Sequence, residues 1–213
     1  MATSPARTRT RKSPAQRSGE IHDAALGLAR EQGLSALTLR SVAARAGVAS
    51  GLVAHYATSM DDLIARTFRE LTAGELDDVR RQADASDDAA GRMAVLIATV
   101  LGRDHDDITL VWVDAWSLGR GSAALSAAID EQMQAWQSYI AGIIRDGRIA
   151  GMFAVDDEEA VAWQILAMID GLSAHALTRG TDAALFAARL AQACETLVGA
   201  AAGTIVSRLP SAT

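Results

Sequence analysis

The first 17 residues of this 213-residue chain carry five cations and no acid. The cations are Arg7, Arg9, Arg11, Lys12 and Arg17. A basic arm of this kind, which also contains Ser, Thr and Pro, is expected to be disordered by itself and attracted to polyanions. Two interpretations of residues 1–17 stay open. The arm either neutralises nucleic-acid phosphates or serves only as a solubilising tail.

Aromatic and methionine residues beyond residue 90 form a second candidate site. Trp112 and Trp116 are spaced i, i+4 and therefore share one helix face. Such a stripe is typical either of ordinary core or of a small-molecule pocket, which is mostly apolar with a few polar groups. In the pocket interpretation, Tyr139 is a further polar candidate and the lining residues are Met93, Ile97, Trp112, Asp114, Trp116, Met133, Trp136, Met168, Leu172 and His175.

Side chains suited to catalysis or metal binding do not form a recognisable site. The run Asp104-His105-Asp106-Asp107 contains metal-ligand types, but acids before a helix ordinarily stabilise its dipole, and adjacent loop residues rarely converge on one ion. We find no nucleophile elbow and no glycine-rich phosphate loop. Cys194 lies in an apolar segment, as expected of a small buried side chain. We therefore expect no enzyme, no metal and no cofactor.

Composition predicts an all-helical protein. The chain has 45 alanines and only nine aromatics, and its three prolines lie at positions 5, 14 and 210. Alanine is the best helix former and is depleted in strands. A single cysteine excludes an internal disulfide and suits the cytoplasm. The longest run without Asp, Glu, Lys or Arg, residues 46–60, is shorter than the roughly 18 residues of a membrane span. We therefore expect a cytoplasmic protein outside the membrane.

Capping signals divide the chain into about nine helices. Ser18 is expected to cap the first, which ends at Gly33, and Thr38 to open a second over residues 39–46 that stops at Gly47. A third runs from residue 49 or 50 to 56, and Ser59 caps a fourth. Breaks near residues 85–88, 102–107, 119–122, 147–157 and 179–181 leave five more helices.

Residues 38–56 have the spacing of a helix-turn-helix. This unit needs a small residue where its helices touch, a turn residue that tolerates positive φ, and apolar side chains on both sides. Ala43 and Gly47 meet the first two needs, and Val42, Val48 and Val53 meet the third. A generic helical hairpin is the alternative, because Ala and Gly are common in this chain. With the basic arm and the flanking helices, the pattern favours DNA binding.

Base recognition by this unit must be unusual. Residues 46–60 contain no Arg, Lys, Asn or Gln, the side chains that form bidentate pairs with bases. Contacts to bases are therefore expected from Ala49, Ser50, Gly51, Leu52 and His55. Phosphate contacts are expected from the start of the second helix, at Thr38, Arg40 and Ser41. Much of the affinity is then predicted to come from the arm, through Arg7, Arg9, Arg11 and Lys12.

Residues 18–71 resemble a TetR-type transcriptional regulator. The resemblance rests on Glu31-Gln-Gly33, Leu37-Thr-Leu39, Val42-Ala43 and Ala46-Gly-Val48, followed by His55-Tyr56 and Ser59-x-Asp61-x-Leu63. It implies that Tyr56 holds a phosphate and that Ser59 lies at the DNA. His-Tyr is similar to regulators of the choline-responsive BetI type, as are Trp112-Val-Asp-Ala-Trp116, Gly151-Met-Phe153 and Ile169-Asp-Gly-Leu172. Two positions depart from the family: Ala57 replaces a usual Phe, and Met60 replaces a usual Lys that touches a phosphate.

The last two predicted helices, residues 160–177 and 183–206, are apolar nearly all round. Two apolar faces need two partners, which are most simply the protein's own core and a second copy of the chain. Asp170, Arg189 and Glu195 argue against membrane insertion. We therefore predict a homodimer through these helices, which would present two helix-turn-helix units to adjacent major grooves.

Three parts follow: a basic disordered arm over residues 1–17, a helix-turn-helix DNA-binding domain over 18–70, and an effector-binding and dimerisation domain over 71–213. The predicted function is a ligand-responsive DNA-binding repressor, released from a double-stranded DNA operator by a small-molecule effector that reorients the fourth helix. The alternative is an all-α ligand-binding or scaffold dimer with a degenerate DNA-binding unit, which Ala57 and Met60 would permit.

Overall fold

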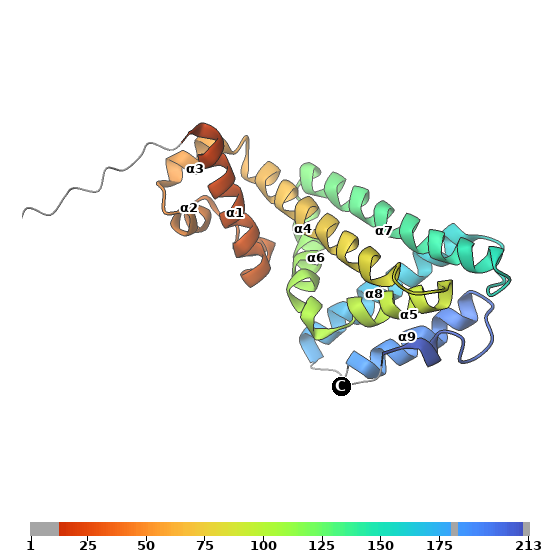
Figure 1. Ribbon diagram of the computed structural model, residues 1–213. Coiled ribbons are helices and arrows are strands. Elements are labelled where there is room, and N and C mark those ends of the chain that lie inside the picture. The colour runs from red at the N-terminus through yellow and green to blue at the C-terminus, as the bar shows by residue number, and fades with distance from the viewer. Residues whose placement is uncertain (1–12, 180–182, 211–213) are drawn as a thin grey trace, which may run out of the picture.

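The computed structural model describes residues 13–179 and 183–210, and within these ranges every regular element is helical (Figure 1). The fold class predicted from composition is confirmed. The α-helices of these described ranges are α1 (Pro14–Gln32), α2 (Leu39–Ala46), α3 (Ser50–Tyr56), α4 (Met60–Ala83), α5 (Ala89–Val100), α6 (Asp106–Gly119), α7 (Ala123–Ile149), α8 (Glu158–Arg179) and α9 (Ala183–Leu197).

Most of the predicted caps are confirmed. The Thr38 hydroxyl accepts the Ser41 N–H at the start of α2, Gly47 ends that helix in the left-handed conformation with φ 65°, and the Ser59 hydroxyl accepts the Asp62 N–H at the start of α4. The cap predicted at Ser18 is wrong. Ser13 caps α1 instead, in a capping box with Gln16, because a proline is well suited to the first helical position that follows.

The earlier start of α1 shortens the predicted arm. Residues 14–17 belong to the helix, and Arg17 forms an ion pair with Glu20 at 3.0 Å. The remaining arm cations, Arg7, Arg9, Arg11 and Lys12, lie outside the described residues.

The molecule is elongated, with α1–α3 at one end and α5–α9 at the other (Figure 1). The long helix α4 runs from the first group into the second, where it packs against α5 and α7. Phe68 in the middle of α4 is fully buried, and the apolar core continues along this helix from Leu63 to Val79. The predicted boundary between residues 70 and 71 therefore falls within a continuous helix.

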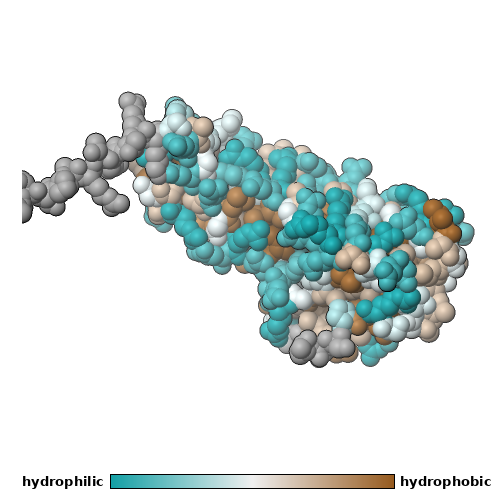
Figure 2. Space-filling model, in the orientation of Figure 1, coloured by the Kyte–Doolittle hydropathy of each residue, from teal (hydrophilic) through white to brown (hydrophobic). Residues whose placement is uncertain are grey.

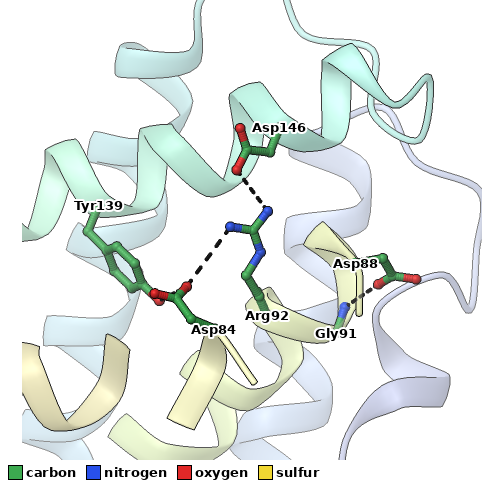
Figure 3. Close-up of polar contacts among 6 residues, drawn as sticks. All are labelled: Asp84, Asp88, Gly91, Arg92, Tyr139 and Asp146. Carbon is green, nitrogen blue, oxygen red and sulfur yellow. Dashed lines mark hydrogen bonds and ion pairs between the residues drawn. The ribbon is translucent and has the colours of Figure 1, made fainter. Parts of the chain in front are cut away.

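Polar contacts join α4, α5 and α7 at one surface (Figure 3). Arg92 of α5 lies 2.8 Å from Asp146 of α7 and 4.0 Å from Asp84 at the end of α4. The Tyr139 hydroxyl donates to the same Asp84 carboxylate, and Asp88 caps α5 by accepting the Gly91 N–H. Tyr139 lies in a groove at this surface with Asp84 and Arg92, so its candidate role beside the tryptophans, which line a different pocket, is wrong.

The last helix is shorter than predicted. α9 ends at Leu197 rather than at residue 206, and Gly199 turns the chain with φ 62°. The carboxylate of Glu195 is buried and accepts the backbone N–H groups of Gly203, Ile205 and Val206 at 2.7–3.0 Å. These hydrogen bonds stabilise a folded-back segment that competes with continued helix.

Candidate nucleic-acid interface and ligand pocket

The predicted helix-turn-helix is present in α2 and α3. Val42, Ala43 and Val53 are buried where the two helices pack, and Val48 packs on the same core from the turn. The left-handed φ of Gly47 makes the tight bend between the helices, and Gly needs no strain to adopt it. Arg45 at the end of α2 forms a bidentate ion pair with Glu31 at 2.5 Å, which fixes α2 against α1.

The outer face of α3 is free to contact a ligand. Ala49, Ser50, Gly51 and His55 are exposed, whereas Leu52 and Tyr56 are half-buried. The rings of His55 and Tyr56 meet edge to face with centroids 5.2 Å apart. Most of the side chains predicted to read bases thus share an accessible face, and their contacts with bases stay a prediction.

Three hydroxyls predicted to lie at the DNA also form hydrogen bonds at the starts of helices. Those of Thr38 and Ser59 cap α2 and α4, and the Ser41 hydroxyl donates to the Ala36 carbonyl at 2.7 Å. Arg40 is exposed beside them. These caps orient the N-terminus of α2, whose free N–H groups favour an anion such as phosphate. Ala57 and Met60, the two departures from the family pattern, are half-buried and pack against the core.

A pocket lies among α4, α5, α6, α7 and α8. It opens to solvent, and its lining is mainly apolar. Four of the predicted lining residues are present: Trp112, Trp116, Met133 and Trp136. The rings of Trp112 and Trp116 lie 6.0 Å apart between centroids, at an interplanar angle of 35°. Phe68 packs edge-on against Trp112, with centroids 4.9 Å apart, and thereby fixes its ring.

Two carboxylates in this pocket were missed by the sequence analysis. Glu75 of α4 is buried and accepts the indole N–H of Trp112 at 2.9 Å, and Asp170 of α8 lines the same pocket. Burial raises the pKa of the Glu75 carboxyl to about 8, although the Trp112 hydrogen bond favours the ionised form. Burial likewise raises the pKa of Asp170 to about 7. Acids held in apolar surroundings beside aromatic rings are suited to binding a cation.

Two family models match the chain. Residues 21–67 match that of the bacterial regulatory proteins of the tetR family, and residues 92–202 match the C-terminal domain of BetI-type transcriptional repressors. The chain belongs to the TetR family. Because this is a family of transcriptional regulators that act on DNA, the prediction that the chain is not an enzyme is confirmed.

Curated relatives of this TetR-family regulator carry the same assignment. The HTH-type transcriptional regulator BetI of Rhizobium meliloti is 29% identical over 155 residues, which cover 70% of this chain and 72% of the relative. BetI of Burkholderia mallei is 33% identical over 111 residues, 47% of this chain. The match spans about half, 53%, of the Burkholderia protein.

Solved structures of regulators have the same fold. A TetR-family regulator from Rhodococcus sp. aligns with a TM-score of 0.71 at 20% identity, over 86% of this chain and 99% of the other. A regulator from Saccharomonospora viridis, solved in complex with choline, aligns with a TM-score of 0.72 at 22% identity, over 83% and 94%. At these identities the likeness establishes the fold alone.

The regulator's other predicted pocket residues lie elsewhere. Met93 and Ile97 are fully buried core residues of α5, and of this helix only Val100 lines the pocket. Met168, Leu172 and His175 line a separate surface groove beside Arg189 of α9. Helical spacing indicates which residues share a face but not which space that face borders.

Asp114 is the last of the predicted pocket residues that lie outside the pocket. It lies between the DNA-binding helices and the larger helical part of the regulator. Its carboxylate accepts the Ser35 N–H at 2.8 Å and lies against Gly33, which has a φ of 81° at the end of α1. Arg30 of α1 and Asp107 of α6 form an ion pair nearby, at 3.3 Å. Figure 2 shows hydrophobic surface in this region of a mostly hydrophilic face. α6 therefore contacts both the pocket and the end of α1.

Among the described helices, only α8 is long and apolar enough to cross a membrane, judged by length and composition. Of the most apolar 18-residue stretch of this helix, only 22% is buried within the chain. Trp163 on this helix is 57% exposed, and Leu185 on α9 is 49% exposed. The two helices thus retain apolar surface that the single chain leaves uncovered.

Proposed function

We propose that this TetR-family regulator is a homodimeric cytoplasmic repressor, and that a small quaternary ammonium compound such as choline releases it from its operator. The observation that carries the proposal is the composition of the pocket. Trp112, Trp116 and Trp136 line it together with Glu75 and Asp170. Aromatic faces attract cations through their quadrupole, and quaternary ammonium groups are the ligands that aromatic cages ordinarily take.

The two carboxylates supply the charge that such a ligand needs. In the empty pocket, burial favours their protonated forms. A bound cation offsets that cost, because an opposite charge nearby stabilises the ionised carboxylate. The choline bound by the Saccharomonospora regulator is consistent with this chemistry.

A route from pocket to DNA runs through α6. Trp112 and Trp116 lie on the pocket side of this helix, and Asp114 between them holds the Ser35 N–H beside α1. Moving the tryptophans onto a ligand would therefore move the carboxylate that supports the DNA-binding helices. α4, which carries Glu75, continues directly into the same domain.

A gel-shift assay with DNA from upstream of the protein's own gene tests the proposal. We expect a sequence-specific complex that dissociates when choline is added, together with choline binding in a calorimetric titration. Specific DNA binding unaffected by choline would contradict the choice of effector. Failure to bind at low salt would instead favour the ligand-binding or scaffold dimer, which the departures at Ala57 and Met60 would permit.

The basic arm gives a first prediction for DNA binding. Deleting residues 1–12, which stops short of the α1 cap at Ser13, removes Arg7, Arg9, Arg11 and Lys12. We expect weaker operator binding and a salt dependence flattened by up to about four phosphate contacts. Measuring the binding constant at several salt concentrations checks this. An unchanged slope would exclude the arm from the interface.

The dimer gives a second prediction. Gly171 lies in the groove between α8 and α9, and a side chain placed there meets no atom of its own chain within 4 Å. Gly171→Arg is therefore expected to leave the protomer folded but to convert the dimer into monomer, because it adds an unpaired charge to an apolar interface. Analytical ultracentrifugation measures the change. Gly142→Arg, at a position on α7 where an added Cβ also meets no atom within 4 Å, is the control and should stay dimeric.

Asp114 gives a third prediction, for communication between the sites. Asp114→Ala removes the acceptor of the Ser35 N–H, whereas Asp114→Asn keeps an oxygen that can accept it. We expect the alanine variant to bind choline with an affinity within about threefold of wild type but to lose most of the choline-induced release of DNA. The asparagine variant should retain release. Gel shifts over a range of choline concentrations distinguish the two variants, and equal release by both would contradict the coupling.

A further inference from the structure

One tryptophan that lines the pocket has a buried hydrogen-bond donor with no acceptor in the described residues. Trp136 of α7 lines the pocket and is 4% exposed, and its indole N–H has no partner within the described part of the chain. Leaving a buried donor unpaired costs free energy, so native structures rarely do so without a reason. The only comparable side-chain atom in residues 13–179 and 183–210 is His22 Nδ1, which belongs to α1 and lies outside the pocket.

Trp112 provides an internal comparison. It lines the same pocket and is similarly buried, but its indole N–H is satisfied by the Glu75 carboxylate at 2.9 Å. Of the two buried indoles that line the pocket, the protein thus supplies an acceptor for that of Trp112 and none for that of Trp136. An unpaired donor in a ligand site is the complement of an acceptor on the ligand.

We infer that the Trp136 indole N–H donates a hydrogen bond to an uncharged oxygen of the effector, and that this contact selects an ammonium compound bearing a hydroxyl or carbonyl group over the same cation without one. The inference rests on the proposed function, since it specifies the ligand of the same pocket. A carboxylate is a poor substitute for the neutral oxygen, because Glu75 and Asp170 repel it and one N–H donor offsets little of that repulsion.

The test compares choline with n-propyltrimethylammonium, which has a methyl group in place of the hydroxyl. Calorimetric titration of the full-length wild-type protein should show choline binding about tenfold tighter, the worth of one buried hydrogen bond. Glycine betaine, which carries a carboxylate, should bind more weakly than choline. In Trp136→Phe the preference for choline over the propyl compound should disappear while both cations still bind.

Trp163→Phe is the matched control, because this tryptophan of α8 is 57% exposed and lies outside the pocket lining. It should keep the tenfold preference. The wild-type ratio requires no variant, so the inference stays testable even if Trp136→Phe fails to fold. In addition, the Trp136 indole proton resonance should shift downfield with choline and not with the propyl compound.

The outcomes distinguish failure of the proposed effector from failure of the role of Trp136. If wild type binds neither cation, the proposed function is wrong and the inference is overturned with it. If both cations bind equally well, the quaternary ammonium effector stands and the role of Trp136 is overturned. A tenfold preference that persists in Trp136→Phe, or tightest binding of glycine betaine, also overturns the inference.

Discussion

Glu75→Gln is expected to lower the affinity of the regulator for choline by about 30- to 100-fold, a change of about 2–3 kcal/mol. The substitution keeps the shape of the side chain and an oxygen that accepts the Trp112 N–H, so it removes the buried negative charge and little else. Calorimetric titration at pH 8 measures the loss. Glu131→Gln, at an exposed glutamate of α7 paired with Arg69, is the control and should bind choline as wild type does.

The same substitution should remove much of the pH dependence of binding. A cation binds best when the pocket carboxyls are ionised, and their pKa values are about 7 for Asp170 and about 8 for Glu75. Choline affinity of the wild type should therefore rise as pH increases from about 6 to about 9. Asp170 and Asp107 add to the rise in the Glu75 pKa, and Arg30 opposes it. Equal affinity at pH 6 and pH 9 would contradict this account.

Stability without ligand should change in the opposite direction. The folded protein holds protons on Glu75 and Asp170 at pH values where the unfolded chain, with ordinary carboxyl pKa values near 4, has released them. The free energy of unfolding should therefore fall as pH rises from about 4 to about 8. Glu75→Gln avoids that loss and should stabilise the empty protein at pH 9 by up to about 4 kcal/mol, measured by urea unfolding.

Gly51→Glu is expected to reduce operator binding by at least about 100-fold. Gly51 is exposed on α3, and a side chain at this position meets no atom within 4 Å, so the variant should fold. Replacing a helical glycine also favours the helix, by up to about 1 kcal/mol. On DNA, however, the new carboxylate would enter a groove bordered by phosphates, where charge repulsion opposes binding.

Gly74→Glu is the matched control for this variant. Gly74 lies within α4, beyond the TetR-family match to the DNA-binding domain, and a Cβ added there also meets no atom within 4 Å. Its gel shift should stay within about twofold of wild type. If the two variants weaken binding equally, net charge rather than the position of α3 is responsible, and the assignment of α3 as the recognition helix fails.

Sequence alone determined the features that depend on local physical chemistry. Thr38, Gly47 and Ser59 act on backbone groups within a few residues of themselves, so the bounds of α2, α3 and the start of α4 could be predicted from residue type and spacing. The failure at Ser18 has the same basis: Ser13, followed directly by Pro14, is the stronger N-terminal signal.

Which residues line the pocket, and how α6 contacts the end of α1, was decided only by the tertiary structure. The i, i+4 spacing placed Trp112 and Trp116 on one face, but Asp114 between them faces the end of α1, and nothing in α6 alone indicates that neighbour. Glu75 and Asp170 lie 95 residues apart and acquire their raised pKa values from burial between helices that meet only in the fold. The end of α9 depends likewise on Glu195, which binds backbone groups eight to eleven residues farther along. A helix signal is local, whereas burial and long-range hydrogen bonding depend on which surfaces pack together.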